Sequence, residues 1–191
     1  MRIKTTWFKQ DEQPKSYEQN ATVIASTIWR LSDTAVINLS KADFDIVTPE
    51  RGFRIIGELA AFLVHLSDRL AHTRMLAAER AVFVQTIAKR LAEVMEFNVR
   101  VVVGEDGYDY QADFIAMLNR RAVDYAAFNF PARAPDFAVL RYLGNCILDI
   151  MEERDQHWVV GQIMEVEAPN AIDTIIKSMD GLLGPPEPAS P

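Results

Sequence analysis

The spacing of apolar side chains constrains the fold most, because they recur every three to four residues through most of the chain. This period places apolar residues on one face of an α-helix, whereas a half-buried β-strand would alternate apolar and polar residues. The sequence therefore predicts an all-α protein, an irregular bundle of five or six helices. The clearest apolar face lies within residues 49–72 and consists of Ile55, Ile56, Leu59, Phe62, Leu63, Leu66 and Leu70.

Capping residues and prolines indicate where individual helices begin. Thr48 could cap the second helix, since its side-chain oxygen can accept a hydrogen bond from the first turn, and Pro49 suits the first helical position. Thr73 is the candidate cap between the second and third helices. Pro135 opens the fifth helix and Pro169 opens the last one. The expected helices cover residues 16–40, 49–72 or 49–74, 76–96, 109–128, 135 onwards and 169–183, with Gly184 after the last.

A charged run interrupts the fifth helix. Residues 152–157 read Glu-Glu-Arg-Asp-Gln-His and follow directly on Met151. The helix therefore either leaves the core at this run, or bends there before it resumes at Trp158. Its apolar face before the run comprises Phe137, Leu140, Leu143, Ile147, Ile150 and Met151.

Residues 99–110 allow two interpretations. Val99 and the valines at 101–103 favour a strand, and residues 104–107 are typical of a turn, which together would form one short β-hairpin near residues 99–110. Equally, the third helix could extend and stop at Gly104. The residues alone do not decide between these two structures.

The length of the chain and its single cysteine limit how the chain can be organised. A chain of 191 residues fits one helical domain, residues 1–184, followed by a Pro-rich tail at 185–191 that we expect to be flexible. Cys146 is the only cysteine, which excludes an intrachain disulfide, and its apolar neighbours predict a buried, inert thiol. The first residues lack the apolar run of a signal peptide, and no segment reaches the ~20 apolar residues that cross a bilayer. We expect a cytoplasmic protein without a membrane partner.

The charge balance is acidic and uneven. The net charge is −7, and residues 105–191 carry 6 basic against 15 acidic side chains, whereas residues 1–104 carry 14 against 12. Binding to nucleic acid requires basic side chains that neutralise phosphates. The sequence therefore predicts no nucleic-acid partner.

The best candidate for a chemical site is a polar stripe on the second helix. His65, Asp68 and His72 follow each other at spacings of three and four residues, on one side of the helix. Two imidazoles and a carboxylate in this arrangement could hold a divalent metal such as zinc or iron. Glu58 lies further back on the same side, and Glu153 and His157 could approach from the fifth helix. The candidate metal ligands are thus His65, Asp68, His72, Glu58, Glu153 and His157.

The same stripe is also typical of a helix face in water. It lies opposite the apolar face and mixes charges of both signs. His65 and His72 are two turns apart, about 10 Å along the axis, which is too far for both to bind one ion from a straight helix. The helix also lacks the His-Glu-x-x-His motif of zinc enzymes. We therefore favour a solvated face over a metal site.

These observations favour a non-catalytic function. We expect a helical binding or scaffolding module that associates with itself as a homodimer or with another protein. The alternative is a metal-dependent enzyme or sensor with a His/Asp/Glu site between the second and fifth helices. A third hypothesis is a small-molecule pocket lined by Phe62, Tyr142 and Met151.

Overall fold

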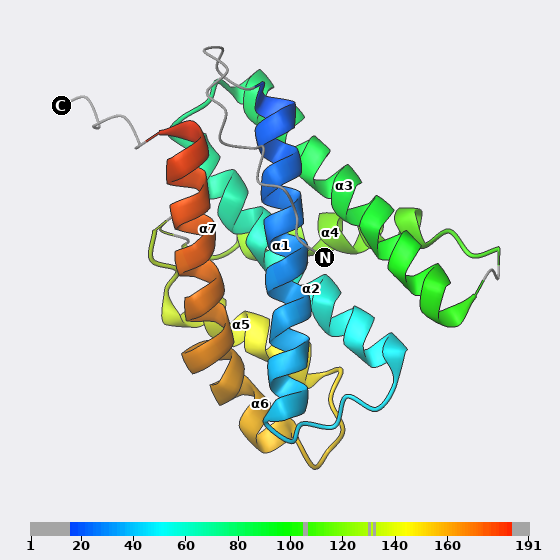
Figure 1. The fold of residues 1–191 in the computed structure, drawn as a ribbon. Helices are drawn as coiled ribbons and strands as arrows, with labels where there is room; N and C mark the ends of the chain where they lie inside the picture. The colour runs from blue at the N-terminus through cyan, green and yellow to red at the C-terminus, as the bar shows by residue number, and fades with distance from the viewer. Residues whose placement is uncertain (1–15, 105–106, 130, 132, 185–191) are drawn as a thin grey trace, which may run out of the picture.

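The structure, a computed structural model, describes residues 16–104, 107–129, 131 and 133–184, and in these residues it is all-α, without a strand (Figure 1). The predicted helical bundle is confirmed. The predicted tail at 185–191 lies outside the described residues. In the described part, no helix has the length and apolar character needed to span a membrane. The elements are α1 (Tyr17–Lys41), α2 (Pro49–His72), α3 (Ala77–Val103), α4 (Tyr110–Ala126), α5 (Phe137–Leu148), α6 (Gln156–Gln162), the π-helical turn η2 (Ile163–Glu167) and α7 (Ala168–Leu183).

Helix α2 is the centre of the bundle. It packs against α1, α3, α4, α5 and α7, while α1 also packs against α3 and α7. Figure 1 shows α1 and α7 side by side in front of α2, with α3 running to one side. All residues from 55 to 64 are buried. Because neighbours surround this part of α2, its polar side is covered as well as its apolar face.

The predicted helix starts are mostly confirmed. The backbone N–H of Arg51 donates to the Thr48 hydroxyl at 3.2 Å, and Pro49 is the first residue of α2. The prediction for Thr73 is wrong for the start of α3, because Thr73 follows the last turn of α2. Helix α3 begins after Leu76, whose N–H donates to the Glu79 carboxylate at 3.0 Å. A carboxylate in the first turn thus provides the cap that Thr73 was expected to provide.

Of the two interpretations of residues 99–110, the extended third helix is confirmed, since α3 continues to Val103, and the alternative β-hairpin is not seen in the described part of this segment. The helix ends at Gly104, which has a φ of 99° and donates its N–H to the Arg100 carbonyl at 2.9 Å. The reason is packing: Phe83, Ile87, Leu91, Met95 and Val99 are all buried, so the helical period of the core face runs into the valines. Burial along this face overrides the strand preference of valine.

The last helical stretch begins earlier than Pro169. Helix α6, the turn η2 and α7 follow one another without a gap, so helix covers residues 156–183. Proline lacks an N–H and its ring clashes with the carbonyl four residues before it in a regular helix. The wider π-helical turn directly before Pro169 accommodates this residue. Glu167 in this turn is buried and accepts hydrogen bonds from Asn38 at 3.1 Å and Gln162 at 3.2 Å.

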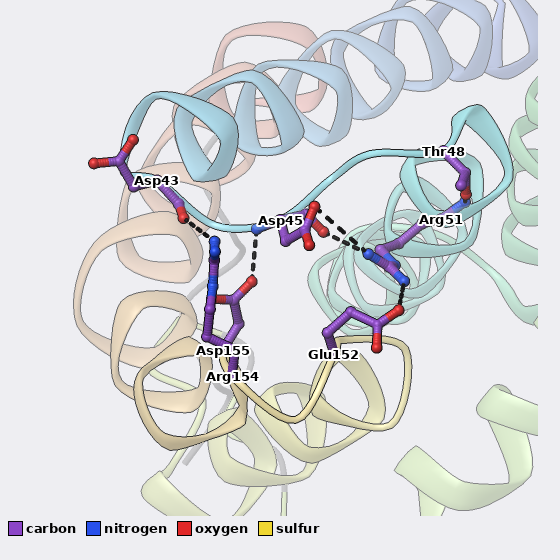
Figure 2. Close-up of polar contacts among 7 residues, drawn as sticks. All are labelled: Asp43, Asp45, Thr48, Arg51, Glu152, Arg154 and Asp155. Atoms are coloured by element: carbon purple, nitrogen blue, oxygen red, sulfur yellow. Dashed lines mark hydrogen bonds and ion pairs between the residues drawn. The ribbon is translucent and has the colours of Figure 1, made fainter.

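The charged run after α5 forms a turn that docks on the loop between α1 and α2. Helix α5 ends at Leu148, and Phe137 at its start is 65% exposed rather than part of the core face. Asp155 is buried and accepts the backbone N–H of Asp45 at 2.6 Å, and Arg51 pairs with Glu152. The charged side chains of this run therefore form contacts between two loops. Figure 2 shows this contact with Asp43, Asp45, Thr48, Arg51, Glu152, Arg154 and Asp155.

Gly144 provides a test of the packing between α5 and α6. A Cβ atom at this position would lie 2.9 Å from Cγ1 and 3.4 Å from the backbone Cα of Val160, so Gly144→Ala must push the helices apart. We expect it to lower the free energy of unfolding by about 1–3 kcal/mol in urea titrations. Gly161→Ala is the matched control, because nothing lies within 4 Å of its added Cβ. The control should raise stability by about 0.5–1 kcal/mol, and equal effects at both glycines would contradict the packing.

Candidate functional site

An open groove of about 620 Å³ lies between the first half of α2, the second half of α3, and α4. Helices α2 and α3 run in opposite directions, so the end of α3 lies beside the beginning of α2 (Figure 1). Helix α4 packs against both. The groove is therefore built from segments that are far apart in the sequence. Its apolar lining includes Phe53, Met95, Val99, Phe114, Met117 and Ile150.

Gly57 contributes to the shape of this groove. It lies buried in α2, where an added Cβ would be 3.1 Å from the terminal methyl of Met117 and 4.0 Å from the Phe114 ring. The missing side chain lets the side chains of α4 lie directly against the α2 backbone. At Gly57 the lining of the groove therefore comes from α4 side chains, whereas Phe53, Arg54 and Glu58 of α2 line it elsewhere.

A buried ion pair lies in the polar part of the groove. Glu58 of α2 accepts two hydrogen bonds from Arg121 of α4, at 2.6 Å from Nε and at 2.8 Å from a terminal nitrogen. The Glu58 side chain is 10% exposed and that of Arg121 is 26% exposed. Such a bidentate contact fixes both side chains in one geometry. Hydrogen bonding to Glu58 raises the pKa of Arg121, which therefore stays charged.

Arg121 connects this pair to α5. Its other terminal nitrogen lies 3.0 Å from an Asp124 carboxylate oxygen and donates to the Tyr142 hydroxyl at 3.1 Å. The Tyr142 hydroxyl in turn donates to the same Asp124 oxygen at 2.6 Å. The hydrogen bond from Tyr142, followed by that from Arg121, lowers the pKa of Asp124. One guanidinium thus joins α2, α4 and α5.

Aromatic rings surround the far side of this network. The Tyr125 ring stacks on His65 at 5.4 Å and meets Tyr142 edge-on at 5.3 Å. Burial lowers the pKa of His65, so its ring is mainly neutral at pH 7. Burial also raises the pKa of Tyr125, which is fully buried. The three rings therefore pack against one another behind the ion pair, and Tyr142 connects them to it through its hydroxyl.

Cys146 lies on α5, one helical turn beyond Tyr142. Its side chain is buried, as predicted, and burial raises the pKa of the thiol to about 11. The nucleophilic form of cysteine is the thiolate. Cys146 is therefore a protonated, shielded thiol at neutral pH.

Two arginines lie on the groove without a partner. Arg54 of α2 and Arg120 of α4 are exposed, and neither forms a hydrogen bond or an ion pair within the described part of the chain. The groove also carries Glu50 and Asp113. Both acids lie in the first turn of their helices, where the helix dipole favours a negative charge. The acids thus have a structural explanation that the two arginines lack.

The predicted metal ligands on α2 are spread over different contacts. His65 stacks on Tyr125, whereas the Asp68 carboxylate lies 3.4 Å from Nε of Arg80. The Nδ1 atom of His72 lies 2.6 Å from a terminal nitrogen of the same arginine. Asp68 and His72 are therefore brought together around a cation of the chain itself.

The remaining predicted ligands are not joined to these. Glu58 has both carboxylate oxygens on Arg121 and is buried, so the expectation of a fully solvated α2 stripe is wrong at this residue. Glu153 and His157 are exposed at the turn before α6 and at its start. Among the described residues, no group of three or more His, Cys, Asp or Glu side chains could hold a metal ion.

Arg121 was not among the residues predicted from the sequence to form a site. Helix α4 buries Phe114, Leu118 and Tyr125, and Arg121 falls between them on the same face at helical spacing. A cation on a core face is a signal of a buried carboxylate partner. The hypothetical pocket of Phe62, Tyr142 and Met151 is also not this groove, since none of these three residues lines it.

Replacing Arg121 tests how far the site depends on this ion pair. Arg121→Met leaves Glu58 buried without its cation, and we expect the free energy of unfolding to fall by about 3 kcal/mol. The double variant Glu58→Leu/Arg121→Met should lose less of the free energy of unfolding, because neither charge of the pair is left without its partner. Arg90→Met, at the exposed Arg90–Glu93 pair, should change stability by less than about 0.5 kcal/mol. A loss no larger than that of Arg90→Met would show that the buried pair does not organise the site.

The pKa of Cys146 can be tested by alkylation. The rate of iodoacetamide labelling follows the thiolate fraction, so in the folded protein it should keep rising as the pH increases towards 11. The same protein in urea should react much faster and level off near the ordinary thiol pKa of about 9. A folded protein that reaches its plateau at the pH seen in urea would contradict the buried thiol.

Comparison with known proteins gave no matching family model, no matching curated protein and no matching solved structure. What the groove binds must therefore be inferred from its own shape and charge. The features that bear on this are an apolar lining, a locked ion pair, and two arginines at the surface without a partner.

Proposed function

We propose that the protein is a non-catalytic binding module, and that its groove holds a small molecule with an anionic group and an apolar body. The observation that carries this proposal is the position of Arg54 and Arg120, two arginines without a hydrogen bond or ion pair in the described residues, on a groove that also has an apolar lining. An apolar lining suits the body of such a molecule, and a guanidinium suits a carboxylate, sulfonate or phosphate.

The size and lining of the groove support a small molecule. Binding sites for small molecules usually enclose roughly 300–1,000 Å³, and this groove of about 620 Å³ lies within that range. Among its apolar lining residues, Phe114 and Met95 are buried, while Phe53 and Met117 are half-buried. Methionine adapts its shape to different apolar surfaces, so these walls can follow the outline of a ligand.

The charges of the groove support an anionic group. Arg54 and Arg120 can each present planar, paired N–H donors to an oxyanion, and neither forms a hydrogen bond or an ion pair with an acid among the described residues, although the Arg120 charge contributes to lowering the pKa of Asp124. Arg121 does not compete for this role, because Glu58 and Asp124 already neutralise it. Since the chain carries a net charge of −7, attraction of an anion depends on these short contacts rather than on the overall field.

The state of the reactive side chains supports binding rather than catalysis. Both oxygens of Glu58 accept hydrogen bonds from Arg121, so this carboxylate has little freedom to accept a proton from a ligand. The Cys146 thiol is protonated at neutral pH, and His65 is stacked on Tyr125. A metal-dependent enzyme or sensor remains a prediction of the sequence, and no observation in the described residues favours it.

The proposal can be tested with 1-anilinonaphthalene-8-sulfonate, a fluorescent molecule that combines aromatic rings with one sulfonate. Fluorescence titration should show saturable binding at one site, and Arg54→Gln and Arg120→Gln should each raise Kd about tenfold, as expected for the loss of one charge-assisted hydrogen bond. Arg30→Gln is the matched control, because Arg30 is also exposed and without a partner, but lies on α1. It should leave Kd unchanged.

A neutral dye tests the apolar contribution to binding separately from the anionic one. N-phenyl-1-naphthylamine has the same rings without the sulfonate, so its affinity should not depend on Arg54 or Arg120. Met117→Trp places a larger side chain in the groove and should therefore weaken the binding of both dyes. If Arg30→Gln weakened the binding of the sulfonate dye as much as Arg54→Gln did, the groove would not be the anion site and the proposal would fail.

A further inference from the structure

Aromatic side chains from separate segments of the chain line the groove. Phe53 lies on α2, and Phe114 lies one turn into α4. Tyr108 lies in the connection between α3 and α4, and Tyr110 is the first residue of α4. What these four rings contribute to binding depends on how far they are exposed and how firmly the chain holds them.

Two of the four rings have surface that a ligand can reach. Tyr108 is 50% exposed, and Phe53 is half-buried. Phe114 is buried, and the Tyr110 ring is already in contact with both Tyr108 and Arg100. Phe53 and Tyr108 are therefore the aromatic side chains available to a ligand, and they come from different segments of the chain.

Tyr108 is held in place although half of it is exposed. Its carbonyl accepts a hydrogen bond from Arg100 at 2.9 Å, and Arg100 is itself paired with Glu96 at 2.9 Å. The Tyr108 ring forms a T-shaped contact with Tyr110 at 4.8 Å, and the Arg100 guanidinium lies 5.6 Å from the centre of the Tyr110 ring. A side chain that is already positioned loses little conformational freedom when a ligand binds.

We propose that the groove selects aryl acids, that is, molecules whose apolar body is an aromatic ring system with the anionic group attached directly to it. The ring of such a ligand packs against Phe53 and Tyr108. Contacts between aromatic rings in offset-stacked or edge-to-face geometry contribute more than the apolar area they bury. This inference rests on the proposed function and names the class of ligand.

The positions of the arginines favour a compact acid. Phe53 and Arg54 are consecutive residues of α2 and both line the groove, so a ring and a guanidinium lie next to each other. On α4, Met117 and Arg120 are three residues apart and both line the groove as well. An apolar contact and a charged contact are thus available within a short distance, as a ring with a directly attached carboxylate requires.

A long alkyl chain is the competing apolar body. Such a chain loses rotational freedom along its length when it binds, and this cost is offset best in a site that encloses it. The groove is open, and the ring surfaces of Phe53 and Tyr108 are flat. A planar ring can contact such surfaces without losing internal freedom, which favours an aromatic body over a chain.

Competition with 1-anilinonaphthalene-8-sulfonate gives the test, with three acids that have the same number of carbon atoms. Naphthalene-2-carboxylate is aromatic, decahydronaphthalene-2-carboxylate has the same fused rings in saturated form, and undecanoate is a chain. We expect naphthalene-2-carboxylate to bind with a Kd about fivefold lower than that of either saturated acid. The saturated acids are the more hydrophobic ones, so this order cannot come from apolar area alone.

Substitutions of single rings locate the preference. Tyr108→Leu and Phe53→Leu should each reduce the preference for naphthalene-2-carboxylate about twofold, because each replaces an aromatic ring by a branched alkyl group. Met117→Leu should change the Kd values of all three acids by the same factor. Phe137→Leu is the matched control, since Phe137 is 65% exposed on α5 and does not line the groove, and it should leave all three Kd values unchanged. Circular dichroism should show the wild-type helix content in every variant.

The outcomes separate this inference from the proposed function. If a saturated acid bound as tightly as naphthalene-2-carboxylate while Arg54→Gln still weakened all three acids, the aromatic preference would be wrong and the groove would remain an anion site. A preference that Phe137→Leu reduced as much as Tyr108→Leu did would also overturn the inference. If the sulfonate dye itself did not bind, both proposals would fail.

Discussion

The paired Glu58 and Arg121 side chains hold the groove side of this bundle together. A carboxylate buried in the central helix is tolerated only because a guanidinium satisfies both of its oxygens. The same guanidinium continues to Asp124 and Tyr142, and so ties α5 to α4. The groove lies directly beside these contacts, on the side where Gly57 leaves α2 without a side chain. Its position is therefore fixed by an ion pair rather than by a loop.

Much of the fold could be predicted from the sequence because it depends on local chemistry. The apolar period acts within one or two helical turns, and so do the helix signals at Thr48, Pro49 and Gly184. The structure places the helix starts and ends close to where these signals predict them. At residues 99–110 the residues left two structures open, because distant packing decides between them. Val99 prefers a strand in isolation, but the core face of α3 already runs through Met95 and continues to it.

The candidate site was much less predictable for the same reason. A helical projection of α2 assigns Glu58 to the side opposite the apolar face, and for a surface helix this side meets water. Helix α2 is central, however, and its partner Arg121 lies 63 residues later in the chain. No spacing within α2 contains that information. The arrangement of charges on one helix therefore indicated a metal site or a solvated face, where the structure has an interhelical ion pair.

The valines at the end of α3 connect the fold to both proposals. Had residues 99–110 formed a hairpin, the groove would lack the wall that Val99 and Val103 provide. The helix instead extends to Gly104, and because a helix turns by about 100° per residue, consecutive valines must face different directions. Val99 faces the core, Val103 the groove, and Val101 and Val102 the solvent. The run of β-branched residues that made the local structure ambiguous thus lines the groove on one side and is exposed on another.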